Sequence, residues 1–211
     1  MAHTLAVVDY GLGNLRSICA ALERLEVSYE CTSDERLIRD CKGLIIPGVG
    51  AFPDGMKNLR RLGLVDLLED LVVERKRPVL GICLGFQLMA REGHEFGLEN
   101  GLGWLAARVV RIEQTDEHIR IPHNGWNDCV RTKDSPIFAD IPPDALFYFT
   151  HSYHMECFDD ADVTALSDHG HKFVAAIQKG HIFGTQFHPE KSQSHGLALL
   201  RNFAHKVVEE C

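Results

Sequence analysis

Three short, mainly aliphatic runs, each leading into a longer amphipathic stretch, constrain the fold of this chain most strongly. The runs occupy residues 5–9, 43–47 and 78–82. A strand that is apolar along its whole length must be covered on both faces, which is typical of parallel sheets with helices on each side. Residues 15–25 and 56–74 carry apolar residues at helical spacing and predict such helices. The first half of the chain therefore predicts a parallel α/β sheet.

The second half has a different pattern, with strand-like runs and few helices. The runs occupy residues 104–112, 146–150, 173–178 and 181–187, and Lys179-Gly180 predicts a hairpin turn between the last two. Amphipathic residues 196–209 predict a closing helix. We expect one α/β domain over residues 1–211, with a mixed, mainly parallel central sheet flanked by helices, as in flavodoxin-like folds.

Charge and cysteine usage exclude several classes of function. The chain has 30 acidic and 22 basic residues, a formal net charge of −8, which argues against a nucleic-acid partner. Its start lacks a secretory pattern and its apolar runs are too short to span a membrane. The seven cysteines are scattered without a C-x-x-C pair, so we expect neither zinc nor a disulfide framework and place the chain in the cytoplasm.

No motif in the sequence calls for a cofactor or a metal. Gly11 and Gly13 follow the first strand, but Arg16 occupies the third glycine position of a dinucleotide loop. His169 and His171 lack a nearby third ligand and indicate a polar loop.

The stretch PVLGICLGFQLM, residues 78–89, predicts a nucleophile at Cys83. A buried strand turns at once into a helical run over residues 85–90, and Gly81 and Gly85 flank the cysteine. Such a turn has no room for flanking side chains, and it presents the thiol at the end of the strand. The helix start favours a thiolate, and the Leu84 N–H would face a developing oxyanion. The alternative is a buried structural cysteine.

The stretch GTQFHPEKS, residues 184–192, predicts the base. His188 lies at the end of a strand-like run that Pro189 terminates, and Glu190 follows closely enough to orient the imidazole. Taken separately, this stretch also fits a strand-end turn with a solvated carboxylate. Together with Cys83 it predicts a Cys–His–Glu triad.

A second oxyanion donor is expected in the loop after the strand at 43–47. Either Val49 or Gly50 offers an N–H with little side-chain obstruction. A flexible surface turn is the alternative.

These motifs resemble those of the class I (triad-type) glutamine amidotransferases. The stretches VVDYGLGNLRS, PGVGAF, IPHNGWN and YFTHSYH narrow the resemblance to the glutaminase subunits of imidazole glycerol phosphate synthases, in histidine biosynthesis. The resemblance covers essentially the whole chain.

The resemblance implies a role for each matching residue. Glutamine would be held by Gln87, Glu95, His151, Ser152 and Tyr153, and Cys83 would attack its side-chain amide. Ammonia would pass to a cyclase subunit with a (β/α)8 barrel, in a heterodimer that makes imidazole glycerol phosphate and aminoimidazole carboxamide ribonucleotide.

The same resemblance implies the contact with that subunit. Asn14, Trp126 and Tyr148 match positions at the interface, although Trp126 also fits a core aromatic. The loop at Val49 would present its N–H only once the partner is bound to its own ligand.

Three alternatives remain. One is a paralogous glutaminase subunit that supplies ammonia for amidating a surface sugar. The second is a free-standing cysteine hydrolase, and the third is a binding module without catalysis.

Overall fold

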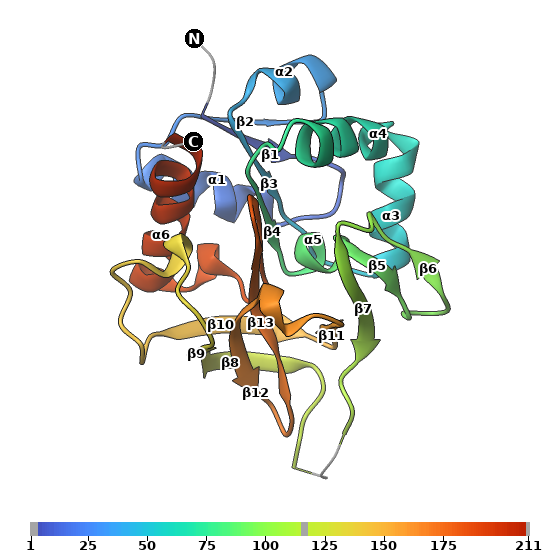
Figure 1. Cartoon of the computed structure of the whole chain (residues 1–211), viewed down its shortest axis with the longest axis vertical. Coiled ribbons are helices and arrows are strands. Elements are labelled where there is room, and N and C mark those ends of the chain that lie inside the picture. Colours follow the sequence, from blue (N-terminus) through green and yellow to red (C-terminus); the bar gives the residue numbers. More distant parts are fainter. Residues whose placement is uncertain (1–3, 115–117, 210–211) are drawn as a thin grey trace.

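The computed structural model describes residues 4–114 and 118–209, which form an eight-stranded central sheet and two smaller sheets (Figure 1). The strand order in the central sheet is β2-β1-β3-β4-β14-β13-β12-β9. Neighbours from β2 to β14 are parallel, and those from β14 to β9 are antiparallel. The strands are β1 (Leu5–Val8), β2 (Tyr29–Thr32), β3 (Gly43–Ile46), β4 (Val79–Ile82), β9 (Val130–Arg131), β12 (Val163–Asp168), β13 (Lys172–Lys179) and β14 (Ile182–Thr185). The mixed, mainly parallel sheet is confirmed.

Side chains of the parallel strands alternate between two hydrophobic clusters, one on each face of the sheet. In β1, Ala6 and Val8 join one cluster while Leu5 and Val7 join the other. All four are fully buried, which is why this strand has no polar face. Helices cover both clusters (Figure 1). On one side lie α1 (Leu15–Arg24) and α6 (Gln193–Asn202), and on the other α3 (Phe52–Arg61) and α4 (Leu64–Glu69).

The helices only partly follow the sequence pattern. They are α1 (Leu15–Arg24), α2 (Glu35–Asp40), α3 (Phe52–Arg61), α4 (Leu64–Glu69), the π-helical η1 (Asp70–Glu74), α5 (Leu84–Gln87), α6 (Gln193–Asn202) and the π-helical η5 (Phe203–Glu209). The prediction of one helix over 56–74 is wrong, because Gly63 breaks it with a left-handed φ of 68°. The helix predicted over 85–90 is present but shorter: α5 has a single turn and ends at Gln87, since Ala90 already begins a strand.

Two smaller sheets hold the rest of the strands. A four-stranded sheet has the order β11-β7-β5-β6, and a two-stranded sheet pairs β10 with β8. The strands are β5 (Ala90–Gly93), β6 (Glu99–Asn100), β7 (Leu105–Arg111), β8 (His123–Asp128), β10 (Leu146–His151) and β11 (Tyr153–Cys157). Short 3-10 helices are η2 (Pro136–Phe138), η3 (Asp160–Asp162) and η4 (Pro189–Lys191). The strands predicted at 104–112 and 146–150 therefore exist, but outside the central sheet.

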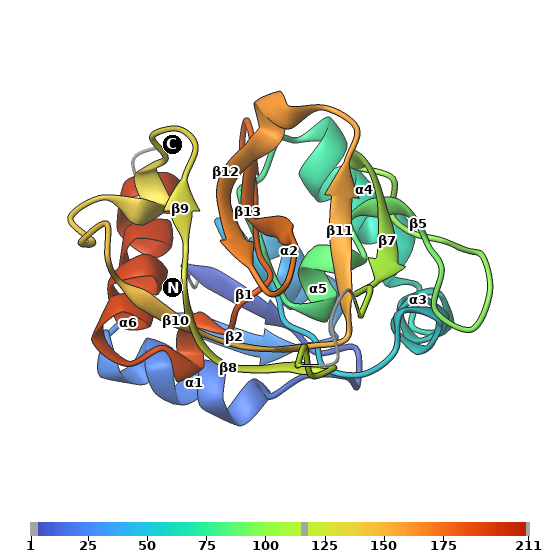
Figure 2. The same cartoon turned by 90° about the horizontal axis from the view of Figure 1, so that it is seen from below.

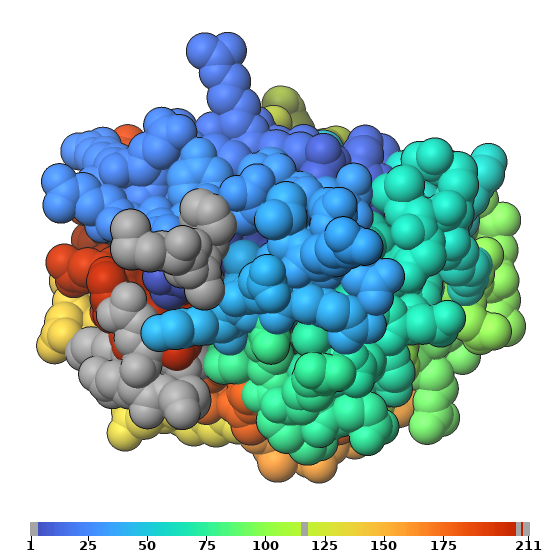
Figure 3. Space-filling model, turned by 90° about the horizontal axis from the view of Figure 1, so that it is seen from above, coloured from blue at the N-terminus to red at the C-terminus, as the bar shows by residue number. Residues whose placement is uncertain are grey.

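The loops at the carboxyl ends of the parallel strands gather near β8 and β10 (Figure 2). The strand order reverses between β1 and β3, and in open α/β sheets ligands bind in the crevice at such a point. Figure 3 shows the opposite end of the molecule, whose surface comes mainly from the first third of the chain. The site is therefore expected at the end that carries β8 and β10.

The described residues carry six cysteines, all of them free thiols, and Cys211 lies outside this part of the chain. Within 4–114 and 118–209, no three His, Cys, Asp or Glu side chains are grouped to hold a metal ion. Nor does any helix in these ranges have the length and apolar character needed to cross a membrane.

Candidate active site

Cys83 occupies a strained turn between β4 and α5. Its backbone has φ 53° and ψ −109°, in a region that costs a non-glycine residue about 1–3 kcal/mol. A Cβ at Gly81 would lie 2.6 Å from the Cα of Phe86, and one at Gly85 would collide with the carbonyl oxygen of Ile46. Both flanking glycines are therefore required, as the sequence predicts.

Side chains as well as the backbone surround the Cys83 sulfur. Gln186 Nε2 lies 3.6 Å from Sγ, in position to donate, and the Thr150 carbonyl oxygen lies 3.9 Å away. The one-turn helix α5 contributes less field than a full helix, since the macrodipole grows with aligned peptides. Sequence reasoning missed Gln186, although it stands two residues before His188 in the same motif.

His188 and Glu190 form a buried hydrogen-bonded pair. His188 Nδ1 lies 2.8 Å from Glu190 Oε1, and the two side chains are 2% and 1% exposed. Burial lowers the pKa of His188, but the electrostatic interaction with Cys83 and then the bond to Glu190 outweigh it and raise the pKa to about 10. The other ring nitrogen, Nε2, is buried and has no hydrogen-bond partner among the described residues. The imidazole is thus oriented by Glu190, and its pKa is raised by the neighbouring Cys83.

Strand β10 holds the loop that carries the base. The His188 N–H donates to the Tyr148 carbonyl, at 2.9 Å. Ser192 Oγ donates to the His188 carbonyl at 2.6 Å and accepts the Tyr148 N–H at 2.9 Å. One residue of β10 therefore fixes both backbone polar groups of His188, directly and through Ser192.

A cavity of about 300 Å³ opens beside Cys83, at the lower end of the range for small-molecule sites. The residues predicted to bind glutamine or an oxyanion all line it: Val49, Gly50, Leu84, Gln87, Glu95, His151, Ser152 and Tyr153. The fold brings these residues together from stretches that lie far apart in the chain.

Glu95 supplies a carboxylate to this cavity. Its Oε2 accepts the Phe52 N–H at the start of α3, at 2.8 Å. Burial raises its pKa, and the hydrogen bond from Phe52 opposes that rise. Its other oxygen is left to meet a cationic group of a ligand.

Gln87 and His151 commit their side-chain donors to the protein. Gln87 Nε2 donates to the Tyr153 carbonyl at 2.8 Å and to Gln186 Oε1 at 3.0 Å, which leaves Gln87 Oε1 for a ligand. His151 Nδ1 lies 2.9 Å from the same Tyr153 carbonyl, and its Nε2 lies 3.1 Å from His123 Nδ1. The His151 ring is fully used, so only its backbone can serve a ligand.

The loop after β3 is held close to the elbow. Tyr10 Oη donates to the Pro47 carbonyl at 2.6 Å, and the Leu84 N–H donates a long 3.4 Å hydrogen bond to the Gly48 carbonyl. A Cβ at Gly48 would lie 2.7 Å from the amide nitrogen of Gly85. In this conformation the Leu84 N–H expected to face an oxyanion is directed at Gly48 instead.

Two of the three residues expected at a partner interface form an aromatic pair, in which Trp126 is exposed and Tyr148 is half-buried. Trp126 is 45% exposed and packs edge-on against Tyr148, with ring centroids 6.0 Å apart. The alternative of a core aromatic at Trp126 is therefore wrong. Asn14 is half-buried at the start of α1, next to Gly13, where a Cβ would lie 3.3 Å from Pro47.

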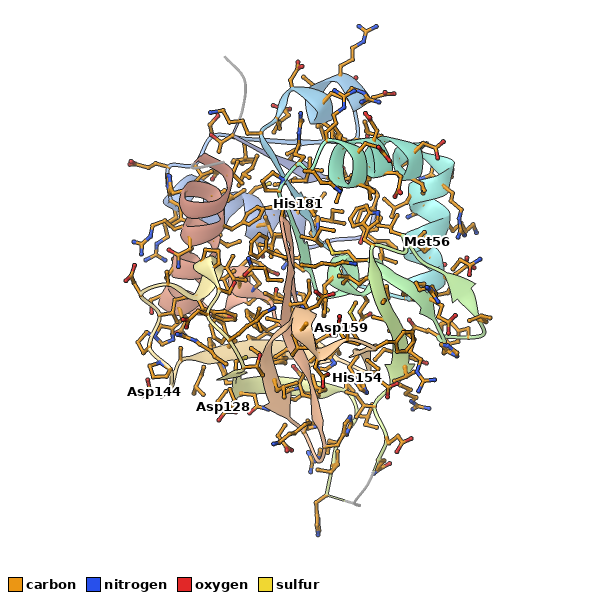
Figure 4. All side chains as sticks on the ribbon, viewed as in Figure 1. Met56, Asp128, Asp144, His154, Asp159 and His181 are labelled. Carbon is orange, nitrogen blue, oxygen red and sulfur yellow. The ribbon has the colours of Figure 1, made fainter. Side chains whose placement is uncertain are left out.

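A larger hollow of about 840 Å³ lies between β7 and β11 on one side and β12 and β13 on the other. His154 of β11 lies in this region (Figure 4). The hollow contains no member of the triad, so its size does not make it the active site.

Comparison with known families gives a match over nearly the whole chain. The model of the family "Glutamine amidotransferase class-I" matches residues 6–207. Relatives named imidazole glycerol phosphate synthase subunit HisH include one from Campylobacter jejuni (HisH 1), 44% identical over 94% of this chain and 98% of the relative. The relative from Leptospira interrogans is 41% identical over 95% and 98%, and that from Pseudomonas aeruginosa (HisH 2) is 40% identical over 96% and 100%.

Solved structures share the fold at low sequence identity. A structure described as PurLQS from Thermotoga maritima has a TM-score of 0.73 at 19% identity and covers 98% of this chain and 99% of its own. A glutamine amidotransferase from Thermotoga maritima has a TM-score of 0.67 at 19% identity, covering 97% of each chain. At this identity the likeness shows the fold alone.

Proposed function

Because the chain belongs to the class I glutamine amidotransferase family, we propose that it is the glutaminase subunit of an imidazole glycerol phosphate synthase. It hydrolyses glutamine to glutamate and ammonia, for use in histidine biosynthesis. The observation that carries this proposal is the strained Cys83 elbow beside the buried His188–Glu190 pair, at the edge of a cavity sized for a small molecule.

The reaction proceeds through a thioester on Cys83. The Cys83 sulfur attacks the side-chain amide carbon of glutamine, and the carbonyl oxygen becomes an oxyanion. His188 Nε2 gives its proton to the departing nitrogen, the C–N bond breaks and ammonia leaves. His188 Nε2 then takes a proton from a water molecule whose oxygen attacks the thioester carbon. The carbon–sulfur bond breaks, glutamate is released and Cys83 is regenerated.

The cavity offers a complementary group for each end of glutamine. The free Glu95 oxygen pairs with the α-ammonium group, and Gln87 Oε1 accepts a hydrogen bond from the substrate. The backbone of His151, Ser152 and Tyr153 lines the remaining wall.

Ammonia loses its nucleophilicity when water protonates it, so its passage from the site of production to its consumer has to be sealed from solvent. We assign that consumer to a cyclase subunit with a (β/α)8 barrel, in a heterodimer located in the cytoplasm. Asn14, Trp126 and Tyr148 form its contact with this chain, and exposed aromatic side chains such as Trp126 are common at the centre of interfaces.

The loop at Val49 and Gly50 provides a reason for low activity without the partner. The Leu84 N–H donates its hydrogen bond to the Gly48 carbonyl, so it becomes available to an oxyanion only after the loop moves. Gly50, with φ 112°, gives the loop the backbone freedom for such a change.

Glutamate production, measured with and without the cyclase and its nucleotide substrate, tests the proposal. Activity is expected to be low for the chain alone and to rise by about tenfold or more when both are added, since freeing one oxyanion donor is worth at least that much. Cys83→Ala is expected to lower kcat by about 10⁴-fold or more in the complex.

The same assay separates the alternatives. Full activity without the partner indicates a free-standing hydrolase. Low glutaminase activity that the cyclase and its nucleotide fail to raise indicates a protein serving another amidation. Equal background rates for the wild type and Cys83→Ala indicate a binding module.

A further inference from the structure

Two buried histidines face each other across the small sheet that lies beside the active site. His123 of β8 pairs directly with His151 of β10, and their rings are joined by the 3.1 Å contact between His123 Nδ1 and His151 Nε2. His123 is 3% exposed and His151 is 6% exposed. The mechanism proposed above uses neither imidazole.

Hydrogen-bond partners at the two ends fix the direction of this contact. The Tyr153 carbonyl can only accept, so His151 Nδ1 carries a hydrogen and His151 Nε2 is the acceptor. His123 Nδ1 must then donate, which leaves His123 Nε2 to accept from Asn127 Nδ2, at 3.3 Å. Burial lowers the pKa of His123 to about 4 and that of His151 to about 3, so both rings are neutral at pH 7. A single arrangement of protons satisfies every hydrogen bond in the row formed by the Tyr153 carbonyl, His151, His123 and Asn127.

Asn127, at one end of the row, is hydrogen-bonded to a neighbouring strand, and His123, in its middle, is held between two rings. Asn127 Nδ2 also donates to the Asp168 carbonyl of β12, at 2.8 Å. The His123 ring is stacked between Phe149 and His169, with centroids 4.9 Å and 4.2 Å away. His123 therefore has one position and one tautomer.

The inner end of the row reaches the nucleophile through three further bonds. The Tyr153 carbonyl accepts from His151 Nδ1 and also from Gln87 Nε2. Gln87 donates in turn to Gln186 Oε1, and Gln186 Nε2 lies 3.6 Å from Cys83 Sγ. The position of the Tyr153 carbonyl thus affects the Gln87 side chain and, through it, Gln186, whose Nε2 is the donor that meets the sulfur.

We propose that His123 is a positioning residue for the glutaminase reaction, acting through His151 and the Tyr153 carbonyl on Gln87, Gln186 and the Cys83 sulfur. This inference rests on the proposed function. It extends the site to a residue of β8, the strand that also carries the exposed Trp126. Loss of the His123 donor leaves His151 Nε2 buried without a partner, and the Tyr153 carbonyl is then free to shift.

Two substitutions at one position separate positioning from packing. His123→Phe keeps the stacked ring and removes both nitrogens, whereas His123→Asn keeps a donor at the place of Nδ1 and loses the ring. We expect His123→Phe to lower kcat in the complex with the cyclase and its nucleotide by about 10- to 100-fold, the size of effect that a misplacement of about 1 Å produces. KM for glutamine is expected to change less than kcat, and His123→Asn is expected to recover most of kcat despite its poorer packing.

His169→Phe is the matched control, because it changes a ring stacked on His123 without removing a bond of the row. Its kcat is expected to equal that of the wild type. A wild-type kcat in His123→Phe overturns the inference. Equal losses in His123→Phe, His123→Asn and His169→Phe, in step with their melting temperatures, overturn it as well.

A readout without turnover keeps this inference distinct from the proposed function. In protein labelled with ¹⁵N-histidine, His123 and His151 are expected to show neutral Nδ1–H tautomers at pH 7. The alkylation rate of Cys83 by iodoacetamide, followed on its peptide by mass spectrometry, is expected to change in His123→Phe and to stay unchanged in His169→Phe. Both expectations hold even if glutamine is not the substrate, and an unchanged rate in His123→Phe counts against positioning.

Discussion

Histidines of this chain show how far surroundings decide the chemistry of a side chain. His188 has a raised pKa because its interactions with Cys83 and Glu190 outweigh its burial. His123 and His151 are buried beside neutral partners, so burial lowers their pKa values. His188 therefore carries a proton at neutral pH while His123 and His151, in the same site, stay neutral.

An NMR titration of His188 tests this account at the residue scale. Its imidazole is expected to stay protonated well above pH 7 in the wild type, because the raised pKa of about 10 means that the proton is lost only in alkaline solution. Cys83→Ala removes the larger of the two interactions that raise the His188 pKa, so this pKa is expected to fall by more than about one pH unit. An equal titration in both proteins would contradict a thiolate–imidazolium interaction.

The triad can be predicted at this scale because glycines on either side of a cysteine are visible in the sequence. Gln186 cannot, since its contact with Sγ depends on β14 lying beside β4. The family resemblance assigns His151 to the substrate, whereas the structure shows its ring bonded to His123 and Tyr153. A sequence names the residues near a site but does not show which atoms are already used.

At the scale of elements, β10 connects the aromatic pair Trp126–Tyr148 to the catalytic base. The ring of Tyr148 packs against Trp126 while its backbone holds His188, directly and through Ser192. Because the same residue has both contacts, a displacement of β10 at the surface moves the base.

Ser192→Ala tests this connection. The change leaves the Tyr148 N–H and the His188 carbonyl without their hydroxyl partner, so we expect a loss of about 1–3 kcal/mol in the free energy of unfolding and a lower kcat. Ser135→Ala is the matched control, because the Ser135 hydroxyl is buried without a hydrogen-bond partner among the described residues. Urea denaturation and glutaminase assays on both variants measure the two effects, and an equal response of the two would contradict the role of Ser192.

Elements that bury one continuous apolar surface are predicted well. β1, β3 and β4 and the helix α1 lie where the pattern places them, because burial on both faces of the sheet leaves a clear signature. The sequence pattern does not predict short strands such as β5 and β8. Their stability comes from pairing with distant strands, and the tertiary context overrides the weak local preference.

At the scale of the whole molecule, the sheet order can be expected only in part. The sequence indicates a parallel core with antiparallel additions, and both are present. Nothing local specifies that residues 105–111 and 146–151 leave the central sheet for two smaller ones. Those smaller sheets supply part of the wall of the cavity, so the site depends on the least predictable part of the fold.

Buried neutral histidines also make the stability of the whole molecule depend on pH. The folded pKa values of His123 and His151, about 4 and 3, lie below the ordinary value of 6.5, so the unfolded chain binds protons that the folded chain does not. Stability contributed by each histidine is complete above about pH 6.5 and falls with decreasing pH, by up to about 1.4 kcal/mol per pH unit. His188 changes in the opposite sense, and its contribution is lost as the pH rises through its folded pKa.

His123→Phe removes the His123 contribution, and the remaining groups cancel in the difference from the wild type except His151, which interacts with His123. Between about pH 7.5 and 4.5 the free energy of unfolding of this variant is expected to gain about 2–3 kcal/mol relative to the wild type. Phe149→Leu, a non-titrating change in the ring stacked on His123, should show a difference from the wild type that does not vary with pH. Urea midpoints at several pH values measure all three proteins, and a pH-independent difference for His123→Phe would mean that this ring is already protonated in the fold.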